Sequence, residues 1–178
     1  MFPELSFHVV GVSYHTAAVG VREQFAVTEA ELAVMLEHEH VAGRSALFLF
    51  TCNRCELYWC GPHDYESWFR ELARARGLTL AGEIGRLDGE EALRHLFTVA
   101  AGLDSQILGE TEILGQVRRA YDAARAAGTT MLEMDLIFSA ALSAGRRVRR
   151  ETMLGRHPAS VSSAAVELAA GSWRNGFD

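Results

Sequence analysis

The chain has 178 residues, of which 49% are hydrophobic and 22% charged, which fits one globular domain with a sizeable core, with or without a helical extension. Its formal net charge of −6 argues against a general nucleic-acid coat protein, and no apolar run is long enough to span a bilayer. No basic segment precedes the first apolar stretch, and an odd number of cysteines makes no disulfide framework, so we expect a cytoplasmic protein without a signal peptide.

The first part of the chain contains one strand pattern and one helix pattern. Residues 6–14, SFHVVGVSY, are apolar and rich in β-branched side chains, and they predict a strand. Thr28 fits an N-cap position, and Glu31 stands three residues later. This capping box predicts a helix over 29–40.

A second strand pair and a helix follow. Residues 45–50, SALFLF, form a short apolar run that is typical of a buried strand, and 55–60, CELYWC, would be its hairpin partner. Residues 65–76 have apolar side chains at helical spacing, and Gly77 follows as a stop signal. The order of patterns predicts a small sheet built partly from a hairpin.

The second half of the chain favours helices. The predicted helical segments are 89–103, 111–128, 131–154 and 160–171. The sequence therefore predicts an α/β (α+β) fold, with a small mainly antiparallel sheet, packed helices and a following helical segment.

All three cysteines lie within ten residues, and together with a histidine they give the spacing C-x2-C-x4-C-x2-H. Four such ligands, here Cys52, Cys55, Cys60 and His63, would suit structural zinc if they converged on one centre. If 55–60 is a strand, however, Cys55 and Cys60 face opposite sides and lie roughly 17 Å apart. We therefore expect no metal site.

Two other roles remain for these thiols. Cys52 and Cys55 form a CxxC pair, but the second cysteine opens a strand where a redox pair would open a helix. Cys52 alone lies in a polar turn, where Arg54 would favour its thiolate and Thr51 and Asn53 would position a carbonyl substrate. A buried, inert cysteine fits the pattern equally well.

A basic stretch stands out against the acidic whole. Residues 144–156, AGRRVRRETMLGR, contain five arginines and one glutamate. Such a cluster suits binding to phosphate groups, or else it is the solvated face of a helix. Charge alone leaves both interpretations open.

Four segments, in order, resemble the glutamyl-tRNA reductase family. They are VGVSYHTAAVGVRE (10–23), TCNRCELY (51–58), HLFTVAAGLDSQILGETEILGQVRRAY (95–121) and GRRVRRETMLGRHPASVSSAAVELA (145–169). The resemblance implies an oxidoreductase of tetrapyrrole (porphyrin) biosynthesis. In that family a cysteine attacks the ester carbonyl of glutamyl-tRNA, and NADPH reduces the resulting thioester to glutamate-1-semialdehyde.

The resemblance also assigns roles to individual residues. It implies that Cys52 is the catalytic nucleophile and that His95 is catalytic as a proton donor to the leaving ribose oxygen. The implied substrate-binding residues are Thr51, Asn53, Arg54, Ser105, Glu110, Thr111, Glu112 and Gln116, with Arg54 as the partner of the glutamyl carboxylate. Thr111 and Glu112 depart from the family, which commonly has Pro and Gln there, so Glu112 would face the substrate ammonium or point away. Cys55 also replaces a common threonine.

The resemblance predicts two regions. Residues 1–155 would form the catalytic domain, and 156–178 a helical extension leading toward an NADPH-binding domain that is absent here. No G-x-G-x-x-G motif occurs, so we expect NADPH in the full-length enzyme and no cofactor bound by this chain. The implied partners are glutamyl-tRNA and, in the full-length family, a second copy; no membrane is expected. The alternative is a short relative that acts as a glutamyl-tRNA esterase, an acyl transferase or a tRNA- or protein-binding module.

Overall fold

An antiparallel sheet forms the centre of the computed structural model, which describes residues 6–80, 82–106, 110, 112–152 and 154. The strands are β1 (Phe7–Ser13), β2 (Ser45–Phe50), β3 (Arg54–Cys60) and β4 (Gly85–Asp88). Their order across the sheet is β2-β3-β1-β4, and every neighbouring pair is antiparallel. Every residue of β3 is buried, which explains the nearly continuous apolar pattern at 55–60.

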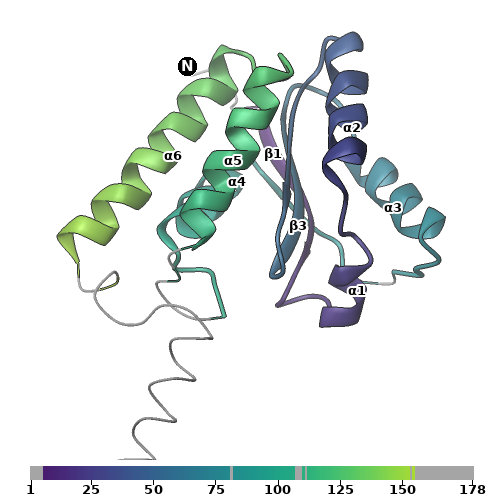
Figure 1. The fold of residues 1–178 in the computed structure, drawn as a ribbon, viewed down its shortest axis with the longest axis horizontal. Helices are drawn as coiled ribbons and strands as arrows, with labels where there is room; N and C mark the ends of the chain where they lie inside the picture. Colours follow the sequence, from purple (N-terminus) through teal and green to yellow (C-terminus); the bar gives the residue numbers. More distant parts are fainter. Residues whose placement is uncertain (1–5, 81, 107–109, 111, 153, 155–178) are drawn as a thin grey trace, which may run out of the picture.

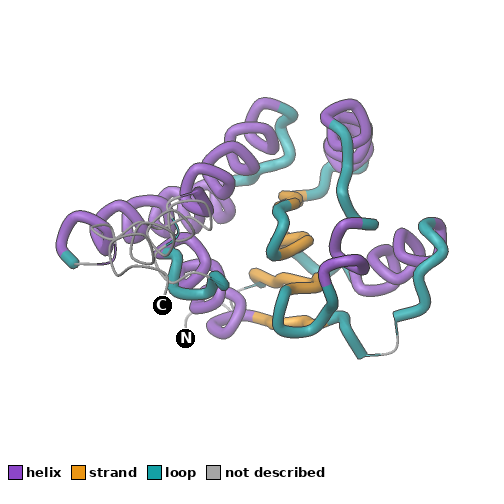
Figure 2. Tube along the Cα trace, turned by 60° about the horizontal axis from the view of Figure 1, so that its bottom comes forward, coloured by secondary structure: helices purple, strands orange, loops and turns teal. Residues whose placement is uncertain are grey.

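Helices cover both faces of this sheet in the described residues. They are α1 (Val19–Glu23), α2 (Glu29–Val41), α3 (Tyr65–Ala75), α4 (Gly89–Ala101), α5 (Glu112–Ala126) and α6 (Leu132–Glu151). Figures 1 and 2 show α4, α5 and α6 on one side of the sheet, and α1, α2 and α3 on the other. The chain therefore folds into three layers, with the main core between the sheet and the helices.

The predicted fold class and most predicted elements are confirmed. The β2–β3 hairpin pairs Ser45 with Cys60 and Phe50 with Cys55, as the apolar runs indicated. The capping box is present, because the Thr28 hydroxyl accepts the Glu31 N–H and the Glu31 carboxylate accepts the Thr28 N–H. Gly77 adopts a positive φ of 73° just after α3, where a side chain would be strained.

Two short elements were missed by sequence reasoning. Helix α1 is five residues long and β4 only four. In β4, GRLD, only Leu87 is apolar, and it is half-buried, so the strand has no alternating pattern to detect. Pairing with β1, rather than local propensity, stabilises it.

Close packing fixes α6 against its neighbours. A Cβ atom built on Gly145 would lie 2.5 Å from the Ala100 carbonyl oxygen and 2.9 Å from the Leu114 side chain. A glycine at this point therefore lets α6 approach α4 and α5. The predicted helix at 160–171 and the proposed extension at 156–178 lie outside the described residues. None of the described helices has the length and apolar character needed to cross a membrane.

Candidate active site

The turn between β2 and β3 presents Cys52 on a fixed backbone. The Thr51 hydroxyl accepts the N–H groups of Asn53 (3.2 Å) and Arg54 (3.0 Å), and the Thr51 N–H donates to the Arg54 carbonyl (2.8 Å). Buried Arg22 donates through Nε to the Cys52 carbonyl at 3.0 Å. Each of these bonds restrains the backbone, while the Cys52 residue itself is exposed.

The other two cysteines differ from Cys52 in their surroundings. Both Cys55 and Cys60 are buried. Burial, assisted by a nearby glutamate in each case, raises the pKa of each thiol to about 12. At neutral pH both are therefore protonated and poor nucleophiles, which leaves Cys52 as the accessible thiol.

Arg54 is fully buried and pairs with two carboxylates. Its Nη1 lies 3.0 Å from Glu56 Oε1 and 3.2 Å from Asp104 Oδ2, and its Nη2 donates to the Asp104 carbonyl. A substrate carboxylate that bound both terminal nitrogens would have to displace these acceptors. The Nε of Arg54 has no hydrogen-bond partner within the described part of the chain, so one donor remains unused.

His95, on α4, contacts the same network. Its Nε2 lies 2.9 Å from Glu56 Oε1, and the Tyr58 hydroxyl donates to Glu56 Oε2 at 2.6 Å. Burial alone would raise the pKa of Glu56, but Arg54 and the bonds from His95 and Tyr58 lower it below its ordinary value. Glu56 is thus an anion that orients the His95 ring.

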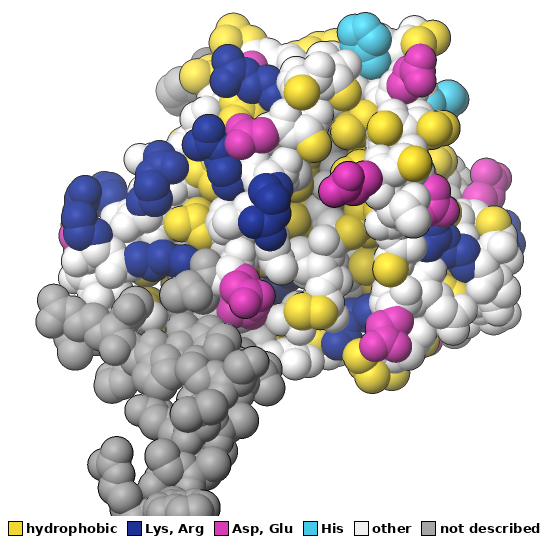
Figure 3. Space-filling view, viewed as in Figure 1, with side chains coloured by type: hydrophobic (Ala, Val, Ile, Leu, Met, Phe, Trp, Pro, Cys, Tyr) yellow, Lys and Arg dark blue, Asp and Glu magenta, His cyan; other side chains and the backbone are white. Residues whose placement is uncertain are grey.

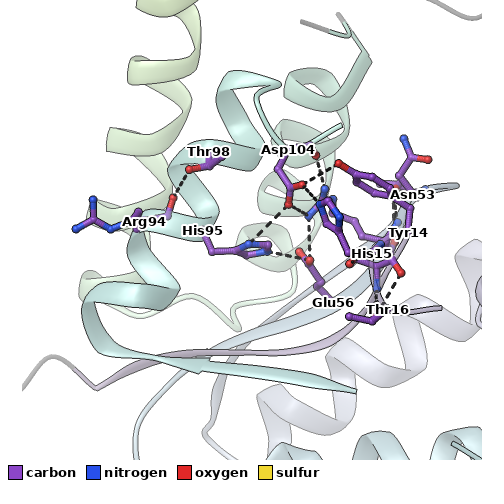
Figure 4. Close-up of polar contacts among 12 residues, drawn as sticks. Tyr14, His15, Thr16, Asn53, Glu56, Arg94, His95, Thr98 and Asp104 are labelled. Atoms are coloured by element: carbon purple, nitrogen blue, oxygen red, sulfur yellow. Dashed lines mark hydrogen bonds and ion pairs between the residues drawn. The ribbon is translucent and has the colours of Figure 1, made fainter. Parts of the chain in front are cut away.

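Asp104 joins this network to the loop after β1. Tyr14 and His15 contact Asp104 Oδ1 at 3.2 and 2.7 Å, and His95 Nδ1 lies 3.9 Å from Oδ2 (Figure 4). Burial would raise the pKa of Asp104, but Arg54 and His15 lower it. Asp104 therefore remains charged between two histidines and an arginine.

A cavity of about 240 Å³ opens beside these groups. His15, Glu56, His95 and Asp104 line it, together with residues of β1 and β4. Cys52 is not among its lining residues. The contacts that connect the Cys52 turn with His95 are the ion pair between Arg54 and Glu56 and the hydrogen bond between Glu56 and His95.

Glu110 and Asn53 contact each other on the other side of the turn. Asn53 Nδ2 donates to Glu110 Oε2 at 3.4 Å, and Arg149 of α6 donates to the Glu110 carbonyl at 2.7 Å. Burial and the neighbouring Glu112 carboxylate raise the pKa of Glu110, although Arg54 and Arg149 oppose the shift. This carboxylate thus lies beside the Cys52 turn.

The remaining predicted residues are more dispersed. Ser105 is buried next to Asp104, and Glu112 is exposed at the start of α5. Gln116 lines a different and larger groove, of about 780 Å³, between α2 and α5. Thr111 lies outside the described residues.

Sequence reasoning missed Glu56, Asp104, Tyr14 and His15. Glu56 did carry a signal, because it is the one charged residue in the predicted strand 55–60, and Arg54 stands two residues earlier, where a strand places it on the same face. Asp104 carried no such signal. Its partners come from the distant β1 loop and β3.

Neither a metal nor a dinucleotide fits the described site. Within the described part of the chain, no three His, Cys, Asp or Glu side chains cluster closely enough to hold a metal ion. Cys55 and Cys60 stand at opposite ends of β3. The strand pairs are all antiparallel, whereas the dinucleotide-binding fold needs parallel βαβ units, so these residues do not fit NADPH.

Comparisons with known proteins agree on one family. The family model described as glutamyl-tRNA(Glu) reductase, N-terminal domain, matches residues 10–152. Glutamyl-tRNA reductases from Deinococcus radiodurans and Geobacillus kaustophilus are 44% and 40% identical, over 93% and 90% of this chain and 47% and 37% of their own lengths. The solved glutamyl-tRNA reductase from Methanopyrus kandleri superposes with a TM-score of 0.75 at 34% identity, covering 92% of this chain and 39% of that one.

This chain spans less than half the length of these relatives. The match nevertheless includes the Cys52 turn, His95 and Asp104. The chain belongs to the glutamyl-tRNA reductase N-terminal domain family.

Proposed function

We propose that this chain is the catalytic domain of a glutamyl-tRNA reductase and that Cys52 takes up the glutamyl group as a thioester. One observation carries the proposal: the exposed thiol lies on a restrained turn that continues through Arg54 and Glu56 to His95. A thiolate is a competent acyl nucleophile, and a thioester is a better hydride acceptor than an oxygen ester.

The acyl transfer needs one nucleophile and one proton donor. The Cys52 sulfur attacks the ester carbonyl, so that a C–S bond forms and the bond to the ribose oxygen breaks. His95 supplies the proton that this oxygen takes up. Because Glu56 accepts from Nε2–H, and Nδ1 is beyond hydrogen-bond distance of Asp104, Nδ1 takes the proton that the Cys52 thiol gives up and passes it to the ribose oxygen.

The substrate's charges match the surrounding groups. The ammonium of the glutamyl group would pair with Glu110 and the exposed Glu112. Its carboxylate would pair with Arg54 by displacing the Asp104 contacts of the terminal nitrogens, with Ser105 beside it. Thr51 and Asn53 would hold the ester carbonyl. Thr111 and Gln116 keep their proposed substrate roles, and Gln116 would act from the adjoining groove.

Reduction belongs to the full-length enzyme in this proposal. The described residues hold no dinucleotide site, so the thioester is the product assigned to this chain. NADPH would convert it to glutamate-1-semialdehyde for tetrapyrrole synthesis elsewhere in the protein, which would be a homodimer.

Transfer of label from glutamyl-tRNA to protein tests the proposal. The chain, incubated with tRNA carrying radioactive glutamate, should retain label on a non-reducing gel. Cys52→Ser should lose this label, while the matched variant Cys60→Ser should keep it. Ester cleavage with free glutamate and no labelled protein would instead support the alternative esterase. Undiminished label in Cys52→Ser would refute the assignment.

A further inference from the structure

Arginines gather on the outer surfaces of α5 and α6. We define the basic face as Arg118, Arg119 and Arg125 of α5 with Arg146, Arg147, Arg149 and Arg150 of α6. Figure 3 shows dark blue side chains spread across the part of the surface that these two helices form. The two helices carry seven arginines and five acidic residues, a balance of +2, in a chain whose net charge is −6.

Much of this positive charge is not neutralised locally. Arg118 pairs with Asp122, while Arg147 and Arg150 share the carboxylate of Glu151. Three exposed arginines, Arg119, Arg125 and Arg146, form no ion pair with any described residue. The last three turns of α6 therefore hold four arginines against one acid. This arrangement differs from a face whose charges merely alternate in sign.

The basic face begins beside the proposed nucleophile. Arg149 donates to the Glu110 carbonyl, and the Glu110 carboxylate accepts from Asn53, the residue after Cys52. If the reactive end of a polymer lay at Cys52, the adjoining part of that polymer would thus pass next to the C-terminal end of α6.

The opposite wall of the groove has the reverse charge. Two glutamates of α2, Glu29 and Glu37, line the groove of about 780 Å³ opposite α5, and α2 has no arginine. Magenta side chains mark this wall in Figure 3. A polyanion would therefore be attracted to α5 and α6 and repelled by α2, which gives it one direction of exit.

We propose that the basic face binds the sugar–phosphate backbone of tRNA next to its acylated end. The inference rests on the proposed function, because that function makes tRNA the polyanion that reaches Cys52. Guanidinium groups bind phosphate oxygens bidentately, and this chain contains arginine but no lysine. Such contacts position the tRNA without reading its sequence.

Binding of deacylated glutamate tRNA tests this surface. The test variant is Arg119→Gln with Arg146→Gln; the control, Arg70→Gln with Arg74→Gln, makes the same charge change on α3, behind the sheet. Fluorescence anisotropy between about 50 and 200 mM salt should show the test variant binding about tenfold more weakly at low salt. Its salt slope should fall by about two, one per lost phosphate contact. The control should stay within about twofold.

A charge-keeping variant separates electrostatics from packing. Arg119→Lys with Arg146→Lys should recover most of the lost affinity and salt slope. Unchanged binding in the glutamine variant, or an equal loss in the α3 control, would overturn the proposal. Because deacylated tRNA has no ester, the outcome does not depend on Cys52. Intact tRNA binding without acyl transfer would refute the proposed function and leave the tRNA-binding surface in place.

Discussion

Arg54 and Glu56 place an ion pair inside an otherwise apolar strand. Burying two charges is expensive, and replacing such a pair with hydrophobic residues is often neutral or stabilising. Stability alone therefore does not explain why a fully buried strand contains them. Their contacts do: Glu56 orients His95, and Arg54 connects Glu56 and Asp104 to the Cys52 turn. The pair positions the groups to which we assign acyl transfer.

The three thiols should react at very different rates. With a pKa of about 12, only about one in ten thousand Cys55 or Cys60 thiols is ionised at pH 8, and both are buried. Brief treatment of the native protein with iodoacetamide should therefore alkylate Cys52, and the urea-unfolded chain should react at all three positions. Comparable alkylation of Cys55 or Cys60 in the native protein, measured by peptide mass spectrometry, would show that these two thiols are not buried.

The lowered pKa of Asp104 predicts a pH dependence of stability. Because its pKa is lower in the folded chain than in the unfolded one, its contribution is present above about pH 4 and disappears as the pH falls further. The free energy of unfolding, measured with urea between about pH 5 and pH 3, should fall less steeply in Asp104→Asn than in the parent. The control Asp122→Asn removes only an exposed ion pair and should keep the parent's pH profile. Identical profiles for all three proteins would contradict the charged Asp104.

Local sequence signals predicted most helices and strands but not the long-range contacts between them. Apolar runs and a capping box determine the hairpin and α2, because these depend on residues close in sequence. Strand β4 depends on pairing with β1, about 75 residues earlier, and so left no local pattern. The motif at 51–54 pointed to the turn that exposes Cys52, whereas the buried contacts of Asp104 arise only from the tertiary fold.

The packing of α6 can be tested at Gly145. Ala is the better helix former by about 1 kcal/mol, yet its methyl group here would meet the Ala100 carbonyl oxygen at 2.5 Å. We expect Gly145→Ala to lower the free energy of unfolding by about 1–3 kcal/mol through overpacking. Gly20→Ala in α1, where no atom lies within 4 Å, should cause no loss. A stabilised Gly145→Ala protein would mean that α6 lies farther from α4.

The whole molecule combines an acidic body with one basic face. The chain apart from α5 and α6 carries a net charge of −8, given the +2 of those helices and the total of −6. The Cys52 turn adjoins this face through Asn53, Glu110 and Arg149. Such a distribution steers a charged substrate toward one side, and its effect weakens as salt increases.

Mapping the glutamyl adduct tests the central claim most directly. Trypsin cleaves after arginine, so it places Cys52 on the peptide 45–54 and both Cys55 and Cys60 on the peptide 55–70. After incubation with glutamyl-tRNA and digestion at mildly acidic pH, mass spectrometry should find one glutamyl group on the peptide 45–54, and neutral hydroxylamine should remove it. A glutamyl group on the peptide 55–70, or ester cleavage with neither peptide modified, would contradict the account.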